Sequence, residues 1–146
     1  MIVLKNVLVA TDFSAASDAA LMYGRALARR FGATLHLLHV ADNPFLRPTI
    51  ADPYALASAT DRLLHERLTE DDRAGGARAV MKTSDRPPDT ITEYARTSAI
   101  DLIVMGTHGR GAMSRLLVGS VAERVVRTAP CPVLTVRQPE HEFVLP

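Results

Sequence analysis

The sequence predicts a single α/β domain, built on an open parallel sheet of five strands with helices on both faces. Short apolar, β-branched runs alternate with segments whose apolar residues recur at helical spacing. Glycine or proline stands near most of the boundaries between them. The 146 residues suffice for one domain with its own core. Alternating strands and helices of this kind form parallel sheets joined by right-handed crossovers.

The elements can be placed from these patterns. Strands are expected over residues 2–11, 33–40, 75–84, 100–106 and 132–136, and helices over residues 14–31, 54–74, 87–99 and 120–129. Three prolines make residues 41–53 a connector, and residues 138–146 form a C-terminal tail to a domain that spans residues 1–146. The run at 100–106 is the most apolar, so it belongs inside the sheet. We expect the Rossmann-like strand order 3-2-1-4-5, with the last strand, from Pro132 to Val136, at an edge.

Composition excludes several classes of protein. The 17 basic and 16 acidic residues give a net charge of +1, without the basic excess typical of nucleic-acid binding. No apolar run approaches the ~18 residues of a membrane span. The chain has one cysteine, Cys131, and its N-terminus does not resemble a secretory leader. We therefore expect a cytoplasmic protein that binds neither nucleic acid nor membrane.

The segment from Gly106 to Val121, GTHGRGAMSRLLVGSV, contains the most informative motif. Its glycines follow a predicted strand, where they allow positive φ and let backbone N–H groups approach a ligand. Ser120 and Glu123 have the spacing of a capping box, which predicts a helix N-terminus at Ser120. Such an N-terminus binds anions through free N–H groups and the helix dipole. Because ligands of open α/β sheets lie at the carboxyl ends of strands where the order reverses, we expect a phosphate site here.

Two standard phosphate-binding motifs do not fit this segment. No glycine pair precedes Lys-Ser or Lys-Thr as in a Walker loop, and the third glycine position of the dinucleotide fingerprint is Ser114. The spacing Gly106-x-x-Gly109, nine residues, then Gly119-Ser120 resembles the ATP-binding motif of the universal stress protein family. The segments VLVATDFS, LHLLHV, DLIVMGTHGRG, GSVAERVV and CPVLTV extend the resemblance through nearly the whole chain.

The resemblance implies a set of ligand contacts. Adenine would lie near Ala10, Thr11, Asp12 and Val40, and Met105 would line the floor of the site. Ribose and phosphates would be held by Gly106, His108, Gly109, Arg110, Gly119, Ser120 and Val121. ATP would bring Mg²⁺, with Asp12 reaching the metal through the nucleotide. One position departs from the family pattern, because Ala122 stands where binding members often have Ser or Thr.

Several residues also have ordinary structural interpretations. Asp12 could cap the first helix, although its place at a central strand end favours ligand contact. His36 and His39 alternate with apolar residues and are expected to be hydrogen-bonded structural histidines. The run ERLTEDDR, residues 66–73, is expected to be a solvated helix face.

Three functions remain open at this point. The first is an ATP-binding stress-response regulator, which the family resemblance favours; the second is a slow ATPase or phosphotransferase. The third is a dimeric interaction module that does not bind nucleotide. The sequence offers no general base with an orienting partner, so we assign no catalytic residue. The apolar edge strand, together with the family resemblance, implies a homodimer that pairs this strand across a two-fold axis.

Overall fold

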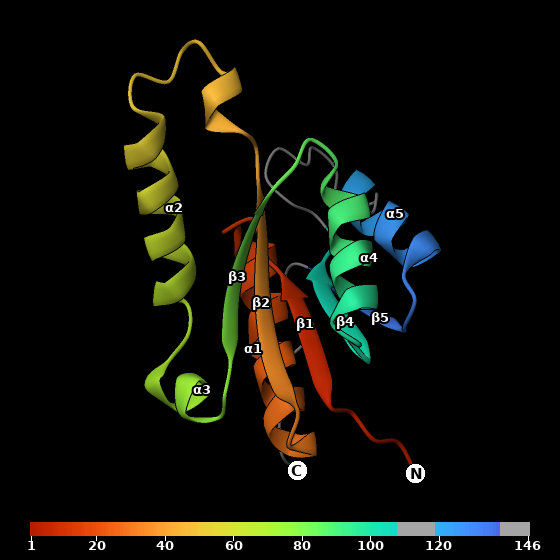
Figure 1. Ribbon diagram of the computed structural model, residues 1–146. Coiled ribbons are helices and arrows are strands. Elements are labelled where there is room, and N and C mark those ends of the chain that lie inside the picture. The colour runs from red at the N-terminus through yellow and green to blue at the C-terminus, as the bar shows by residue number, and fades with distance from the viewer. Residues whose placement is uncertain (108–118, 138–146) are drawn as a thin grey trace.

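The computed structural model describes residues 1–107 and 119–137 of the chain, and Figure 1 shows its α/β arrangement. The described strands are β1 (Asn6–Ala10), β2 (Thr34–Ala41), β3 (Arg78–Thr83), β4 (Leu102–Gly106) and β5 (Val133–Val136). The α-helices are α1 (Ala15–Phe31), α2 (Pro53–Glu66), α3 (Glu70–Ala74), α4 (Pro87–Thr97) and α5 (Ser120–Thr128), and the connector contains a short 3-10 turn, η1 (Pro44–Leu46).

The five strands form one parallel sheet in the order β3-β2-β1-β4-β5, which confirms the predicted fold. The chain moves outward from β1 to β2 and β3, and then crosses back to β4 on the other side of β1. The strand order therefore reverses between β1 and β4. In open sheets of this type, a crevice forms at the carboxyl ends of the two strands at this point.

Alternating side chains of the inner strands divide the core into two halves. Val7 and Val9 of β1 pack with α1 on one face, together with Leu64 and Leu68 from the α2–α3 region. The intervening Leu8 faces the other way, into a cluster that also contains residues of α4 and α5. Helices thus cover both faces of the sheet, as Figure 1 shows.

The first helix shows clear start and stop signals. The Ser14 side chain accepts a hydrogen bond from the Ser17 backbone N–H at the N-terminus. Gly32 ends the helix in the left-handed conformation, with φ of 65°. Within the helix, Gly24 lies so close to β1 that a Cβ there would be 2.3 Å from Val9 Cγ2. This glycine lets α1 pack directly on the sheet.

The predicted second helix, residues 54–74, was wrong as a single element. The structure breaks it after Glu66, and Thr69 begins α3 with a capping box in which Asp72 is the reciprocal partner. Asp72 is also only 6% exposed and pairs with Arg25 of α1 at 2.8 Å, so the solvated face expected for residues 66–73 is wrong at this position. A local cap and a buried ion pair outweigh continued helical periodicity here.

Within residues 1–107 and 119–137, no helix is both long and apolar enough to cross a membrane.

Candidate functional site

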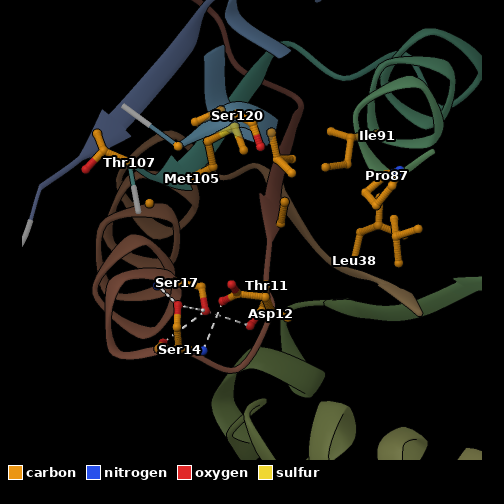
Figure 2. Close-up of a pocket in the computed structure, with 16 residues that line it drawn as sticks. Thr11, Asp12, Ser14, Ser17, Leu38, Pro87, Ile91, Met105, Thr107 and Ser120 are labelled. Carbon is orange, nitrogen blue, oxygen red and sulfur yellow. Dashed lines mark hydrogen bonds between the residues drawn. The ribbon is translucent and has the colours of Figure 1, made fainter. Parts of the chain in front are cut away.

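A pocket of about 360 Å³ opens at the carboxyl ends of β1 and β4, where the strand order reverses. Its size is within the range of small-molecule sites. Figure 2 shows hydroxyl and carboxylate groups from the turn after β1 and the start of α1 on one side of the pocket, and Leu38, Pro87 and Ile91 on another. The N-terminal residues of α1, α4 and α5 all contribute to the wall. The pocket therefore combines an apolar surface with the positive ends of helix dipoles.

The structure brings together most of the residues that the sequence singled out. Nine line this pocket: Ala10, Thr11, Asp12, Val40, Met105, Gly106, Gly119, Ser120 and Val121. The other three, His108, Gly109 and Arg110, lie outside the described residues. Ala122, the departure from the family pattern, also lines the pocket and is 2% exposed, so this position offers a methyl group and no hydroxyl.

The turn after β1 is held by local hydrogen bonds. The Phe13 N–H donates to Thr11 Oγ1 at 3.0 Å, and the Ser14 N–H donates to Asp12 Oδ1 at 3.0 Å. The hydroxyls of Thr11 and Ser17 are 3.1 Å apart. Asp12 thus orders the residue that caps α1 while it lines the pocket, so the two interpretations of this carboxylate are compatible.

The predicted capping box at Ser120 does not form. Gly119 is the N-cap of α5, its carbonyl accepts the Glu123 N–H at 2.9 Å, and Ser120 is the first helical residue. The Ser120 hydroxyl is therefore one position too late to take the N-cap role. Because Gly119 has no side chain, the first turn of α5 receives no cap from it and presents its N–H groups at the pocket.

Gly106 has a packing role that the sequence did not reveal. A Cβ at this position would lie 2.8 Å from the Cβ of Ala16 and 2.9 Å from its backbone carbon. The glycine at the end of β4 therefore allows α1 to approach the sheet. The expectation that the glycines of this segment let backbone approach a ligand did not include this contact, which itself requires the missing side chain.

The charge pattern restricts the chemistry of the site. Asp12 is the only ionisable side chain among the described residues that line the pocket, and none of them is Lys or Arg. No group of three or more potential metal ligands occurs in the described ranges. An anion at this site would therefore be held by backbone N–H groups and helix dipoles in the part of the pocket described, whereas the carboxylate of Asp12 suits hydroxyl groups or a cation.

The two strand histidines are hydrogen-bonded, as expected. His36 is 2% exposed, with Nδ1 2.7 Å from the Tyr94 hydroxyl and Nε2 3.0 Å from Asn6 Oδ1. Burial, reinforced by the positive charge of Arg78, lowers the pKa of His36 below its usual 6.5. His39 Nδ1 lies 2.7 Å from the carbonyl oxygen of Thr11, a residue that lines the pocket.

Several residues of the pocket wall were not among those singled out from the sequence: Ser14, Ser17, Leu38, Pro87, Ile91 and Thr107. Some had a local signal. Ser14 and Ser17 have N-cap spacing, and Leu38 shares a strand face with Val40 by the period-two rule. Pro87 and Ile91 had none, because only the packing of α4 against the sheet brings that helix to the pocket.

A comparison of the sequence with known protein families matches residues 4–137 to the universal stress protein family. The chain belongs to the universal stress protein family. A universal stress protein of Methanocaldococcus jannaschii is 32% identical over 151 aligned positions, which cover 94% of this chain and 85% of the relative.

Solved structures of related proteins share the fold. A universal stress protein in complex with cAMP superposes with a TM-score of 0.66 at 26% identity, covering 93% of this chain and 98% of the other. A universal stress protein from Archaeoglobus fulgidus in complex with dAMP gives a TM-score of 0.61 at 25% identity, covering 92% and 98%. Both of these similar proteins are described in complex with a nucleotide.

Proposed function

We propose that this universal stress protein binds ATP in the pocket between β1 and β4 and acts as a nucleotide-dependent regulator of a stress response. The main support is the N-terminus of α5, where Gly119 presents the first-turn N–H groups to a pocket that also has an apolar wall. An anion-binding end and an apolar surface in one cavity suit a phosphorylated base. The cAMP and dAMP complexes of similar proteins support the same class of ligand.

The arrangement of the wall suggests an orientation for the ligand. Val40 and Met105, with the neighbouring Leu38 and Ile91, provide the apolar surface for the adenine ring. Asp12 accepts hydrogen bonds from ribose hydroxyls, or from water on a nucleotide-bound Mg²⁺. Phosphates lie toward Gly119, Ser120 and Val121, because the dipole of α5 favours negative charge at this end. Gly106 also lines the pocket.

A regulator fits the described site better than an enzyme. Phosphoryl transfer requires a positioned nucleophile, counter-charge and usually a bound metal. Asp12 is the sole ionisable group of the described wall, and its Oδ1 accepts the Ser14 N–H. The bound nucleotide therefore acts as a ligand that stabilises one conformation of the protein, and that conformation is what a downstream partner recognises.

Thermal unfolding with a series of nucleotides tests the proposal. In the presence of Mg²⁺, ATP should raise the melting temperature most, ADP less and AMP least, since each phosphate adds contacts at the N-terminus of α5. A ligand at a hundredfold excess over its Kd adds about 2.7 kcal/mol to the free energy of unfolding. Equal shifts in melting temperature from all three nucleotides would mean that the site does not contact the additional phosphates of ADP and ATP. A larger shift from cAMP than from ATP would identify cAMP as the preferred ligand. The absence of a shift with every nucleotide would contradict the proposal.

A further inference from the structure

Phe13 has an unusual backbone conformation at the edge of the pocket. Its φ is 66°, and among the described non-glycine residues only Ala99 shares a positive φ. The left-handed region is sterically unfavourable for a residue with a Cβ, so the surroundings have to hold Phe13 in place. Its neighbours on either side, Asp12 and Ser14, both line the pocket. The conformation of Phe13 therefore determines how this turn faces a ligand.

Two side chains from distant parts of the sequence contact the Phe13 ring. The His39 ring lies with its centroid 4.4 Å from that of Phe13, and the guanidinium carbon of Arg67 is 4.8 Å from the Phe13 centroid. His39 also binds the turn directly, because its Nδ1 donates to the carbonyl oxygen of Thr11 at 2.7 Å. We call Phe13, His39 and Arg67 the Phe13 stack. It supplies cation–π and ring contacts that offset the cost of the positive φ.

Arg67 connects this stack to the end of α2. It is the C-cap residue of that helix, and its Nε donates to Asp18 Oδ1 of α1 at 3.0 Å. Its own carbonyl oxygen accepts a hydrogen bond from the Arg25 guanidinium at 2.9 Å. Arg67 is thus fixed between α1 and α2, with its side chain 23% exposed.

Helix α2, which Arg67 follows, has few other contacts with the core. Leu64 is its only buried residue, while Tyr54, Leu56 and Leu63 are 75%, 43% and 43% exposed. Figure 1 shows α2 standing at the β3 side of the sheet, away from α4 and α5. A helix with so few buried contacts belongs to the less stable part of a fold, where small changes in contact energy alter local opening.

We infer that the Phe13 stack couples nucleotide binding to the ordering of α2. Phe13, His39 and Arg67 act as positioning residues that hold the turn after β1, which contains Asp12. A ligand that requires this turn in its present conformation stabilises the stack, and through Arg67 it stabilises the end of α2. Coupling of this kind is reciprocal: the factor by which bound nucleotide favours the formed stack is also the factor by which the formed stack favours nucleotide binding. Weakening the stack therefore lowers the affinity for nucleotide. The inference rests on the proposed function for its ligand, and it assigns α2 as the element that changes with occupancy.

Hydrogen exchange of backbone amides, measured with and without ATP, tests the coupling. In the wild-type protein, ATP should slow exchange in residues 10–17 and also in residues 53–67. Arg67→Met replaces the arginine with an unbranched apolar side chain, and so removes the charge over the ring and the pair with Asp18. We expect it to weaken ATP binding by about fivefold or more and to abolish the effect of ATP on residues 53–67, while protection of residues 119–122 remains. Arg62→Met, which changes an exposed arginine of the same helix, should behave as the wild type.

A double-variant cycle separates positioning from general loss of stability. Phe13→Leu keeps the Cβ and an apolar side chain, although a smaller one, and removes the aromatic ring. The double variant with Arg67→Met should lose less ATP affinity than the two single losses combined, because both changes remove the contact between Arg67 and the Phe13 ring. Additive losses would overturn the inference. So would an Arg67→Met protein that binds ATP within twofold of the wild type and keeps the ligand-induced protection of residues 53–67.

The ligand-free protein distinguishes failure of this inference from failure of the proposed function. Without nucleotide, Arg67→Met should speed exchange in residues 10–17 relative to Arg62→Met, since the stack supports the turn even when no ligand is bound. If the wild type binds no ATP, the proposed function fails, while faster exchange in this comparison still supports the stack. Equal exchange in the two variants would overturn the stack itself, whatever the ligand.

Discussion

Gly106 at the end of β4 lies directly against Ala16 in the first turn of α1, where a Cβ on the glycine would be 2.8 Å from the Ala16 Cβ and 3.0 Å from its carbonyl oxygen. The carbonyl carbon of Ala16 would be 2.9 Å away, so two of the three nearest atoms are backbone and cannot move aside by a change of rotamer. The close approach brings the start of α1 to the wall of the pocket. Packing and the shape of the site therefore depend on the same missing side chain.

Gly106→Ala should destabilise the protein by about 1 to 3 kcal/mol, the usual cost of inserting a methyl group into a packed interface. Gly75→Ala is a matched control, because the nearest atoms to a Cβ there are 3.5 Å away and its φ is −79°. Chemical denaturation of the two variants measures the difference. Equal midpoints would show that α1 shifts from β4 without cost.

Much of the fold could be predicted because its signals are local. The strands follow from short apolar runs, and α1 follows from Ser14 at its start and Gly32 at its end. The crossover connections then leave few strand orders to consider. The errors occur where a distant contact outweighs a local pattern. The break between α2 and α3 depends on Asp72, whose partner Arg25 lies 47 positions away in the sequence.

The candidate site was predictable at its strand ends and less so elsewhere. Asp12 follows from the rule that ligands lie at the carboxyl ends of central strands, whereas Met105 was implied by the family resemblance. The positive φ of Phe13 could not be predicted, because a phenylalanine carries no signal for that conformation and its support comes from His39 and Arg67. The same holds for the N-cap at Gly119, where Ser120 has the better capping propensity.

The stability of the protein should fall as the pH drops below 6.5, because of His36. Its pKa in the folded state is lowered, first by burial and then by Arg78, while in the unfolded chain it stays near 6.5. Above pH 6.5 the imidazole is neutral in both states. Below it the unfolded state binds a proton that the folded state resists, so the free energy of unfolding decreases by up to about 1.4 kcal/mol per pH unit until the folded-state pKa is reached.

His36→Gln should be less stable at neutral pH, since it disturbs the buried contacts with Tyr94 and Asn6, but its stability should depend less on pH below 6.5. His65→Gln provides the control, because the side chain of His65 is 52% exposed. Urea denaturation at several pH values compares the slopes. The explanation fails if His36→Gln retains the slope of the wild type.

The edge strand β5 should form a homodimer by pairing with its copy across a two-fold axis. β5 is the last strand of the sheet, and Leu134 on it is 37% exposed. Leu134→Lys introduces a charge at the edge and should convert a dimer into a monomer. Leu63→Lys, on the exposed face of α2 far from β5 in Figure 1, should leave the dimer intact. Sedimentation equilibrium measures the masses, and a wild-type monomer at micromolar concentration would contradict the prediction.

Gly119→Val should abolish ATP binding and leave the fold largely unchanged. Gly119 has φ of −60° and ψ of 152°, an extended conformation that valine adopts readily, so no strain from a positive φ is expected. The added isopropyl group would instead occupy space at the pocket wall, next to the N–H groups that we propose hold the phosphates. Binding and folding should therefore respond differently to this change.

Circular dichroism and thermal unfolding report the fold of Gly119→Val, and calorimetric titration reports its affinity for ATP. Ser120→Ala is the milder companion, because it removes one hydroxyl from the pocket wall but leaves the backbone N–H groups of α5 in place. Its affinity should fall by no more than about tenfold, which corresponds to about 1.4 kcal/mol or a single hydrogen bond. If Gly119→Val bound ATP as tightly as the wild type, the phosphates would not lie at the N-terminus of α5, and the proposed orientation of the nucleotide would be wrong.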